Sequence, residues 1–547
     1  MGFAHEYATA IVRRGRYPME PADFVPDWAD RPRKGKHFPG AAALPLPQAV
    51  ADPEATVQRG LFGADGPQGP DTGGAFTLPL LAGMLQESYG LVGRRLAVQA
   101  NSDLGTLPMY TQANWSRGSA SGGGLYPVGV HWVAGPSGPL TPGVYYYDTP
   151  HHALRRLLAG DVSGEVRAAL GGGARWAGHD QFLVLGVRFW QNAFKYNSFC
   201  YHVVTMDTGA LLQTWRIWAA AHGLRVGPAF WFDEARLGRL LGLGQDEEGV
   251  FAVVPLAWEG APAPAPGPAA PPADVPVPVP ASAAAPRVRH TDQERSHVTM
   301  TFETVRRMHA ATLDRAAERP APGALDTALA PPVPDGGDRV ALPAPRPLDT
   351  PVSSALRARR SSFGRFQATR PLPARDLSTV LAAIAAAGTL DSDAETPDTG
   401  SLSRSYVFVN HVDGVAPGIY LHDTADGTLR LLKAGPSGAF LQENYFLANY
   451  NLEQAAAVIV PAARTHAVLD AVGDRGYRLV NAVIGGISQA VYTASAAAGL
   501  SCGVALGFDA ISFTEELELE ATGEVPLLIM MIGHERPRPA GFRHEIA

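Results

Sequence analysis

The chain has 547 residues, with 45 Lys and Arg against 52 Asp and Glu and a formal net charge of −7. This mild acidic balance argues against nucleic acid or an anionic membrane as the main partner, because both select basic surfaces. The two cysteines, Cys200 and Cys502, are too few for a disulfide framework and lack metal-ligand spacing, so we expect no metal site. No apolar run approaches the ~20 residues of a membrane helix, and the first residues do not read as a signal peptide. We therefore expect a soluble cytoplasmic protein.

The basic residues are distributed very unevenly between the two types. Only four are lysines, at positions 34, 36, 195 and 433, and the other 41 are arginines. Such a bias is typical of a GC-rich coding sequence, which replaces expendable surface lysines with arginine. A lysine that remains in this composition is a candidate functional residue.

The composition divides the chain into three parts. Residues 261–286 consist almost entirely of proline, alanine and valine, which cannot bury a core and favour an extended linker. A second Pro-rich stretch at 320–347 follows a possible helix at about 297–319. We therefore predict a first domain at 1–260, a Pro/Ala-rich linker with a short helix at 261–348, and a second domain at 349–547.

The two predicted domains are copies of one unit. The sequence PGVYYYDT begins at Pro142 and PGIYLHDT begins at Pro417, which is an offset of 275 in the numbering. Further along, an offset of 276 relates Tyr201 to Tyr477 and Gln213 to Gln489. A register kept to one residue over about 90 positions indicates an internal repeat.

Each copy predicts the same elements in the same order. The expected strands lie at 125–133, 144–147, 182–189 and 250–257 in the first copy, and at 405–409, 419–421, 456–460 and 526–532 in the second. Before the last strand, each copy has a long apolar helix that a Gly-Leu pair ends, at 208–222 and at 479–498. This mixture of strands around a buried helix predicts an α+β fold.

A glycine-rich loop precedes the first strand of the first copy. It reads Arg117-Gly-Ser-Ala-Ser121-Gly-Gly123-Gly124-Leu-Tyr-Pro. Consecutive glycines let backbone N–H groups approach a planar or anionic ligand, and Arg and Ser add donors. The alternative for the glycine run alone is a plain flexible loop.

The second copy begins with a run of arginine and serine, in which Arg360, Ser362 and Arg365 are the candidate ligand contacts. Guanidinium groups bind phosphate in bidentate fashion, and a hydroxyl can complete the cradle. The alternative is a solvated basic run beside the linker.

Lys195 and Tyr196 follow the strand at 182–189 of the first copy. The offset of 276 places Ala471 and Val472 at the matching positions of the second copy. A lysine withdrawn from water has a lowered pKa and can act as a general base, and an adjacent tyrosine can share the proton. The alternative is a lysine that lies along an apolar surface with its charge in solvent.

Together, the glycine loop, the GVYYYD segment, the Lys-Tyr pair and the GALLQTW helix resemble the SagB/ThcOx-type FMN-dependent dehydrogenases of the nitroreductase superfamily. The resemblance covers about 120–260 and 350–535. Relative to the family pattern, the loop lacks its proline, and Gly364 stands where the last Arg of the Arg-x-Ser-x-Arg phosphate motif is expected. The segment from Gly533 to Arg538 resembles the C-terminal basic residues with which the superfamily contacts phosphate. A solvated tail is an equal alternative for this segment. The second-copy loop that contains Gly507 completes the set of expected cofactor contacts.

The resemblance implies two tandem nitroreductase-like domains that form an intramolecular pseudo-dimer. The glycine loop and the Lys-Tyr pair occur only in the first copy and the arginine-serine run only in the second, so we hypothesise one live FMN site and one decayed site. It also implies that Lys195 and Tyr196 are the catalytic pair of a dehydrogenase that converts thiazolines or oxazolines in a ribosomally made peptide to thiazoles or oxazoles. The expected partners are an azoline-containing precursor peptide and a cyclodehydratase complex. The alternatives are an NAD(P)H-dependent nitro- or flavin reductase on the same fold and a non-catalytic partner that presents substrate to a cyclodehydratase.

Overall fold

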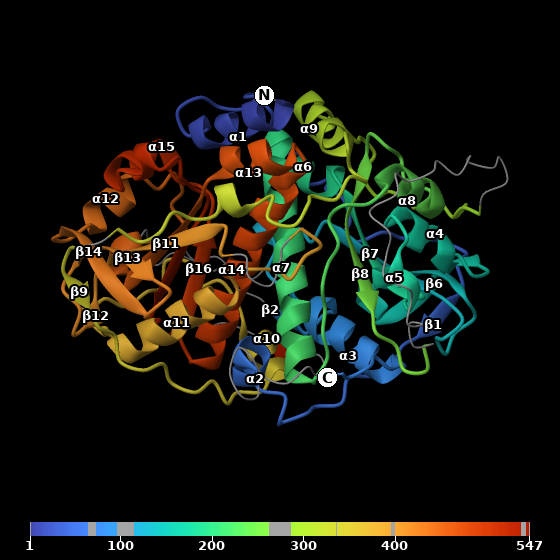
Figure 1. Cartoon of the computed structure of the whole chain (residues 1–547), viewed down its shortest axis with the longest axis horizontal. Helices are drawn as coiled ribbons and strands as arrows, with labels where there is room; N and C mark the ends of the chain where they lie inside the picture. The colour runs from blue at the N-terminus through green and yellow to red at the C-terminus, as the bar shows by residue number, and fades with distance from the viewer. Residues whose placement is uncertain are drawn as a thin grey trace.

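The computed structural model describes residues 2–63, 73–95, 114–261, 286–334, 336–394, 400–537 and 543–545. Two α+β halves lie side by side, and the two longest helices, α7 (Cys200–Ala221) and α14 (Gly476–Ala497), run next to each other between them (Figure 1). Both helices are buried along nearly their whole length, which explains why their sequences are apolar on all faces.

The first half contains a six-stranded antiparallel sheet in the order β1-β6-β5-β4-β7-β8. Its central strands are buried on both faces because α7 covers one face and short helices cover the other. The strands are β1 (Ala43–Pro45), β4 (Val128–Ala134), β5 (Gly143–Asp148), β6 (Ala153–Ala159), β7 (Gln181–Arg188) and β8 (Glu248–Leu256).

The sheet of the second half repeats this order as β9-β14-β13-β11-β15-β18, with β16 added beside β18 and β17 beside β15. The duplication extends to an irregularity, because the pairing register shifts between Val144 and Tyr145 in one sheet and between Ile419 and Tyr420, their equivalents, in the other. The strands are β9 (Arg339–Val340), β11 (Ser403–Val409), β13 (Gly418–Asp423), β14 (Thr428–Ala434), β15 (Ala457–Ala463), β16 (Ser501–Ala505), β17 (Val525–Pro526) and β18 (Ile529–Gly533).

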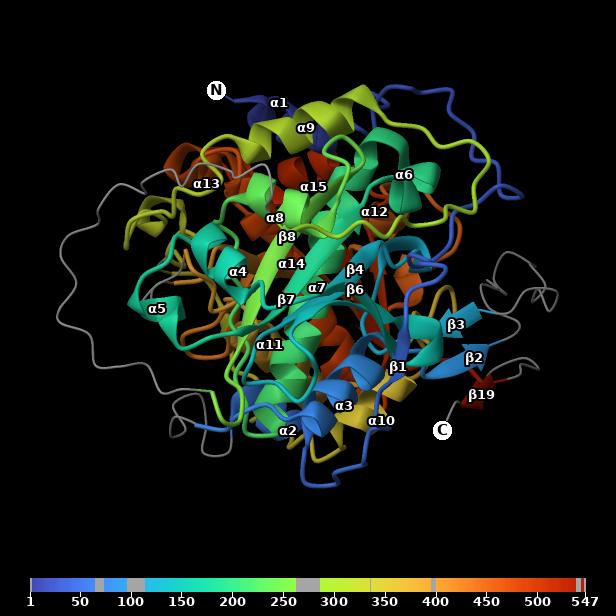
Figure 2. The same ribbon diagram turned by 90° about the vertical axis from the view of Figure 1, so that its right-hand side faces the viewer.

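Shorter helices surround these sheets, and two small sheets complete the strands. The helices are α2 (Val57–Phe62), α3 (Leu78–Tyr89), α4 (Ser163–Ala169), α5 (Ala174–Ala177), α6 (Trp190–Tyr196), α8 (Glu234–Leu241), α10 (Val352–Ala358), α11 (Ala374–Ala386), α12 (Gly438–Glu443), α13 (Thr465–Val472) and α15 (Ala510–Glu516). One small sheet pairs β10 (Leu372–Pro373) with β12 (Val412–Asp413). The other joins β2 (Gly93–Arg95), β3 (Asn114–Ser116) and β19 (Arg543–Glu545), which brings the end of the chain to the first half (Figure 2).

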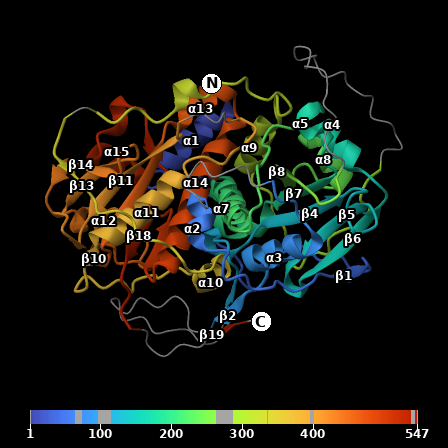
Figure 3. The ribbon, with the colours of Figure 1, turned by 60° about the horizontal axis from the view of Figure 1, so that its bottom comes forward.

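The two central helices cross at a pair of equivalent glycines. A Cβ on Gly209 would lie 1.9 Å from the carbonyl oxygen of Ala482, and a Cβ on Gly485 would lie 2.0 Å from that of Met206. The repeat offset of 276 relates Gly209 to Gly485 and Met206 to Ala482, so each helix offers the other the same surface. This reciprocity is the mark of a two-fold interface between identical subunits, which is here enclosed in one chain (Figure 3).

A second reciprocal contact joins α2 and α10 at the base of the molecule. The amide of Val57 donates to the carbonyl of Thr350 at 2.9 Å, and the amide of Val352 donates to the carbonyl of Ala55 at 2.8 Å. The chain therefore has an internal pseudo-two-fold axis that passes between the central helices and between α2 and α10, and the expected pseudo-dimer is confirmed.

The segments outside the two copies bridge them. Helix α1 (Phe3–Arg13) packs against α13 and α15 of the second half and against α9 (Glu303–Leu313) (Figure 1). Helix α9 is shorter than the expected 297–319 and buries Val305 and Met308 in the main core. Residues 286–348 thus contribute core residues as well as a connection between the halves.

The long helices begin earlier than their apolar patterns predicted, because α7 starts at Cys200 and α14 at Gly476. Polar residues in these first turns, including Tyr201 and Arg478, are buried and belong to hydrogen-bonded networks. Within the described part of the chain, no helix is long and apolar enough to cross a membrane.

Candidate active site

The glycine loop reaches the Lys-Tyr pair because it has no side chain at the point of contact. Gly123 has φ of +62° and Gly124 has φ of +64°, a conformation that favours glycine. A Cβ on Gly123 would lie 2.7 Å from the Tyr196 hydroxyl oxygen and 2.8 Å from Lys195 Nζ. The three predicted site elements therefore meet, and a side chain at position 123 would displace the amine and the phenol.

Lys195 and Tyr196 form the last turn of α6, where the helix dipole favours a cation. Burial lowers the pKa of the Lys195 amine, which brings it closer to the neutral, basic form. Burial also raises the pKa of the Tyr196 phenol, and the nearby Asp207 raises it further. The pair thus combines a proton acceptor with a phenol that keeps its proton.

The carboxylate of Asp207, on α7, lies beneath the glycine loop. Its oxygens accept from the Ser121 hydroxyl at 2.6 Å and from the Gly122 amide at 2.7 Å. The Ser121 hydroxyl oxygen in turn accepts from the Tyr126 amide at 2.8 Å. The hydroxyl of Ser121, predicted as a cofactor contact, is therefore engaged within the loop. Sequence analysis did not identify Asp207, although its equivalent in the second copy is Val483, which is the same kind of asymmetry that identified Lys195.

The second half holds this loop from the other side. Arg359 donates from Nε to the carbonyl of Gly118 at 2.7 Å and from Nη2 to the carbonyl of Arg117 at 3.0 Å. Gln489, on α14, accepts from the amide of Ala120 at 2.9 Å. Arg359 and Gln489 are both buried, so the loop of one copy takes its shape from residues of both copies. Arg359 lies next to the predicted phosphate contacts but was not chosen among them.

The arginines of the predicted phosphate motif share one carboxylate. Glu535 accepts from Arg360 Nη1 at 2.9 Å and from Arg365 Nε at 3.0 Å, so the three groups carry one net positive charge. The amide of Ser362 donates to the carbonyl of Cys502 at 2.9 Å, while its buried hydroxyl has no hydrogen-bond partner among the described residues.

A cavity of about 340 Å³ lies beside this motif, and Arg359, Arg360 and Glu535 line it. Residues from α14 and the start of β16 form much of the rest of its wall; they are Tyr492, Ala496, Gly499, Leu500, Ser501 and Cys502. The cavity thus joins the arginine-serine run of the second half to the central helix that holds the glycine loop.

Arg117 is part of the support of the loop. Its guanidinium lies over the rings of Tyr89 and Tyr126, at 4.5 and 4.3 Å from the ring centroids, and donates to the carbonyl of Lys34 at 2.8 Å. The side chain is 3% exposed, so it fixes the loop against the N-terminal segment.

Gly507 follows β16, and its carbonyl accepts from the amide of Phe446 at 2.8 Å. The neighbouring Leu506 carbonyl accepts from Arg14, whose guanidinium lies 4.5 Å from the ring centroid of Phe199. The Phe199 ring lies 6.0 Å from that of Tyr196, so this chain of contacts links Gly507 to the Lys-Tyr pair. Arg538 lies outside the described residues.

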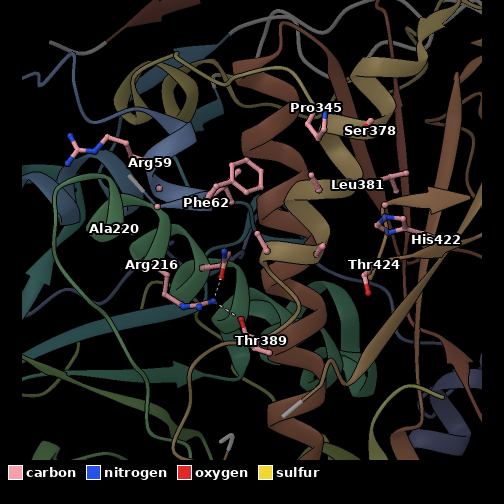
Figure 4. A pocket seen from close by; sticks show the side chains of 18 of the residues that line it. Arg59, Phe62, Arg216, Ala220, Pro345, Ser378, Leu381, Thr389, His422 and Thr424 are labelled. Carbon is pink, nitrogen blue, oxygen red and sulfur yellow. Dashed lines mark hydrogen bonds between the residues drawn. The ribbon is translucent and has the colours of Figure 1, made fainter. Parts of the chain in front are cut away.

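A second cavity, of about 890 Å³, occupies the pseudo-symmetric position (Figure 4). Its lining includes Ala220, Leu224 and Val226, whose equivalents at the offset of 276 all line the first cavity. In place of the loop contacts, Arg216 donates to Gln213 at 2.7 Å and to the carbonyl of Thr389 at 2.6 Å. The second copy has Ala471, Val472 and Val483 as the equivalents of Lys195, Tyr196 and Asp207, so it lacks their polar groups.

The chain is similar to a known family model and to solved structures. Residues 356–534 match the nitroreductase family. A crystal structure from Anabaena variabilis ATCC 29413, described as a predicted nitroreductase, covers 98% of this chain and 100% of its own, with 20% identity and a TM-score of 0.69. One from Ralstonia eutropha JMP134, described in the same way, covers 38% of this chain and 94% of its own, with 21% identity and a TM-score of 0.30.

The E. coli microcin synthetase McbBCD complex with truncated pro-MccB17 bound covers 32% of this chain and 71% of its own chain, with 15% identity and a TM-score of 0.27. No curated protein matches the sequence. The molecule thus has the nitroreductase fold in tandem form, because 98% of the chain matches a structure described as a nitroreductase and residues 356–534 match the nitroreductase family model.

Proposed function

We propose that this protein is an FMN-dependent oxidoreductase with one flavin site per chain, which oxidises thiazoline or oxazoline rings of a ribosomally made peptide. The observation that carries the proposal is the half-buried amine and phenol of Lys195 and Tyr196, which lie against the backbone of Gly123 in one half only. A reaction that removes an acidic ring proton needs such a base.

The residues present fit FMN at two points. Beside the glycine loop, Gly123 is exposed and Gly124 has no atom within 4 Å of an added Cβ, so a planar ring could approach this backbone. At the other end, Arg360 and Arg365 carry one net positive charge with Glu535, and the Ser362 hydroxyl is unsatisfied among the described residues. A phosphate group would meet guanidinium donors there.

Each residue then has a defined task. The Lys195 amine accepts a proton from the azoline ring carbon, and burial favours this step because it lowers the pKa of the amine. The Tyr196 phenol keeps its proton and can donate a hydrogen bond to substrate or to a ring acceptor. When bound, FMN supplies the two-electron acceptor for the hydrogen that leaves with its electron pair, and dioxygen is the proposed reoxidant.

The test is a direct comparison of two reactions on purified protein. The protein is reconstituted with FMN and incubated either with an azoline-containing precursor peptide, prepared with its cyclodehydratase, or with NAD(P)H and a nitroaromatic compound. A loss of two mass units from the peptide supports the proposal. Rapid NAD(P)H oxidation without peptide aromatisation would instead assign the reductase, and a protein that takes up no FMN would assign the non-catalytic partner.

Flavin content tests the one-site arrangement separately. We expect one FMN per chain after release and quantification, because the second copy lacks equivalents of the lysine, the tyrosine and the aspartate. Two FMN per chain would contradict the proposal that the second site has decayed.

A further inference from the structure

The strongest unassigned feature of the molecule is the buried carboxylate beneath the glycine loop. Asp207 is 7% exposed and lies two residues before Gly209, where α7 and α14 are in backbone contact. Its backbone is thus fixed by a close contact between the two halves, while its side chain binds a loop that has consecutive glycines. The carboxylate ties a stiff element to an intrinsically mobile one.

The hydrogen bonds of this carboxylate hold the part of the loop that contains the glycines, whereas Arg359 and Gln489 hold residues 117–120. Ser121 and Gly122 donate to its two oxygens, and the Ser121 oxygen accepts from the Tyr126 amide. The loop is thereby closed from Ser121 to Tyr126, and Gly123 stands at its tip against Lys195 and Tyr196. Among the described residues, this carboxylate is the side-chain acceptor for both Ser121 and Gly122.

We propose that Asp207 is a positioning residue, which holds the glycine loop in the conformation that presents the Gly123 backbone to Lys195 and Tyr196. This inference rests on the proposed function in one respect: Gly123, Lys195 and Tyr196, which Asp207 would position, belong to the proposed flavin site. It assigns Asp207 no contact with substrate or cofactor.

The protonation state of the carboxyl group does not change this role. Burial raises the pKa of Asp207 to about 7, against the opposing effect of the two hydrogen bonds. A protonated carboxyl group can still accept from the Gly122 amide with one oxygen. With the other oxygen it can donate to the Ser121 hydroxyl, which then acts as the acceptor in this hydrogen bond. Among the described residues, the phenols of Tyr196 and Tyr89 interact with this carboxyl group, and burial keeps both phenols protonated. A neutral amide of the same shape should therefore reproduce the contacts.

The experiment uses three variants of the full chain. Asp207→Val introduces the residue found at the equivalent position of the other half, and Asp207→Asn keeps one acceptor for Gly122 and a donor for Ser121. Thr208→Val is the matched control, because Thr208 is buried on the same helix but bonds only the Val204 carbonyl within it. Hydrogen exchange of residues 119–126 in flavin-free protein is the primary measurement, with kcat and KM for the azoline peptide as the second.

We expect Asp207→Val to raise loop exchange at least tenfold and to lower kcat at least tenfold, with a smaller change in KM. Asp207→Asn should retain loop protection and at least a tenth of the turnover, and Thr208→Val should leave both near wild type. Unchanged exchange in Asp207→Val would overturn the proposal, and so would an Asp207→Asn protein that has a protected loop and no turnover, since Asp207 would then act through its charge.

Loop exchange does not depend on which substrate the enzyme oxidises, so a wild-type protein without azoline activity would refute the proposed function and leave the positioning role measurable. If Asp207→Val does not fold, Ser121→Ala removes the hydroxyl that joins Asp207 to the Tyr126 amide and leaves the Gly122 bond in place, and it should raise exchange in the same segment. Unchanged exchange in a folded Ser121→Ala protein would likewise overturn the proposal.

Discussion

The two halves of this molecule share a strand order, a bulge position and a central helix, but their two cavities have different chemistry. Around the first cavity, Arg359 and Gln489 of the second half hold the glycine loop of the first. Around the second cavity, the equivalent Gln213 accepts from Arg216, so the amide that should hold a loop is occupied within its own helix.

This difference separates the contacts that the fold requires from the polar groups of the proposed site. The contacts that build the interface are present twice, as in the crossing of Gly209 and Gly485 and in the reciprocal pairing of α2 with α10. The amine, the phenol and the carboxylate of the site are present once. The interface is therefore nearly symmetric, whereas the polar groups of the proposed site are confined to one half.

The largest expected effect is on turnover, and it comes from removal of the Lys195 amine, which only the first half contains. Lys195→Ala should lower turnover of the azoline peptide by about 10²–10⁴-fold, the usual contribution of a general base, while the flavin remains bound. Lys433→Ala is the control, because Lys433 forms an exposed ion pair with Glu516 far from the loop and should leave turnover unchanged. Steady-state rates with flavin occupancy measured in parallel distinguish the two. Loss of flavin, with normal turnover per bound flavin, would refute the role of Lys195 as the base.

Substitution of either glycine at the crossing of α7 and α14 should lower the free energy of unfolding by the same amount. Gly209→Ala and Gly485→Ala each place a Cβ about 2 Å from a carbonyl oxygen of the other helix, so each should lower the free energy of unfolding by about 3 kcal/mol. Gly238→Ala in α8 is the control, because an added Cβ there meets no atom within 4 Å, and it should stabilise by about 0.5–1 kcal/mol. Urea denaturation measures all three. A large cost for only one of the central glycines would contradict the pseudo-symmetry of the interface.

These contrasts show which features of the molecule could be predicted from its sequence. The offset of 276 predicted the tandem repeat, and the order of expected strands and helices predicted the α+β fold, because apolar patterns and duplicated turns are local features of the sequence. The pseudo-dimer was expected from the family resemblance. The meeting of the glycine loop with Lys195 and Tyr196 was also expected from the family resemblance.

The supporting contacts were not predictable, because they depend on long-range packing. Arg359 could not be distinguished from Arg360 in a run of arginines, and the sharing of Glu535 by Arg360 and Arg365 joins segments that are distant in the chain. The contact of Arg117 with Tyr89 and Lys34 likewise links three separate segments. Asp207 was within reach, since the same alignment that compared Lys195 with Ala471 also compares Asp207 with Val483.

An intermediate effect, on the affinity for FMN, is expected from the equivalent residues Gln489 and Gln213. Gln489→Ala removes the acceptor of the half-buried Ala120 amide, and an unsatisfied N–H costs up to about 1–3 kcal/mol when it is fully buried. We expect the Kd for FMN to rise about tenfold, as measured by flavin fluorescence. Gln213→Ala removes only an acceptor for Arg216, which keeps its bonds to Thr389 and Asp391, and it should leave the Kd unchanged. Equal effects of the two substitutions would indicate that both cavities bind flavin.

The last difference between the halves is the pH dependence that burial gives to the half with the proposed site. Since burial lowers the pKa of Lys195, the neutral base accumulates at a lower pH than it would for an exposed lysine. Turnover should therefore rise with pH by up to tenfold per unit and level off below pH 10.5, the ordinary value for lysine. The measurement is kcat against pH at saturating peptide. A rate that is flat with pH would show that proton removal by Lys195 does not limit the reaction, and a rate that falls as the pH rises would show that the amine acts in its charged form.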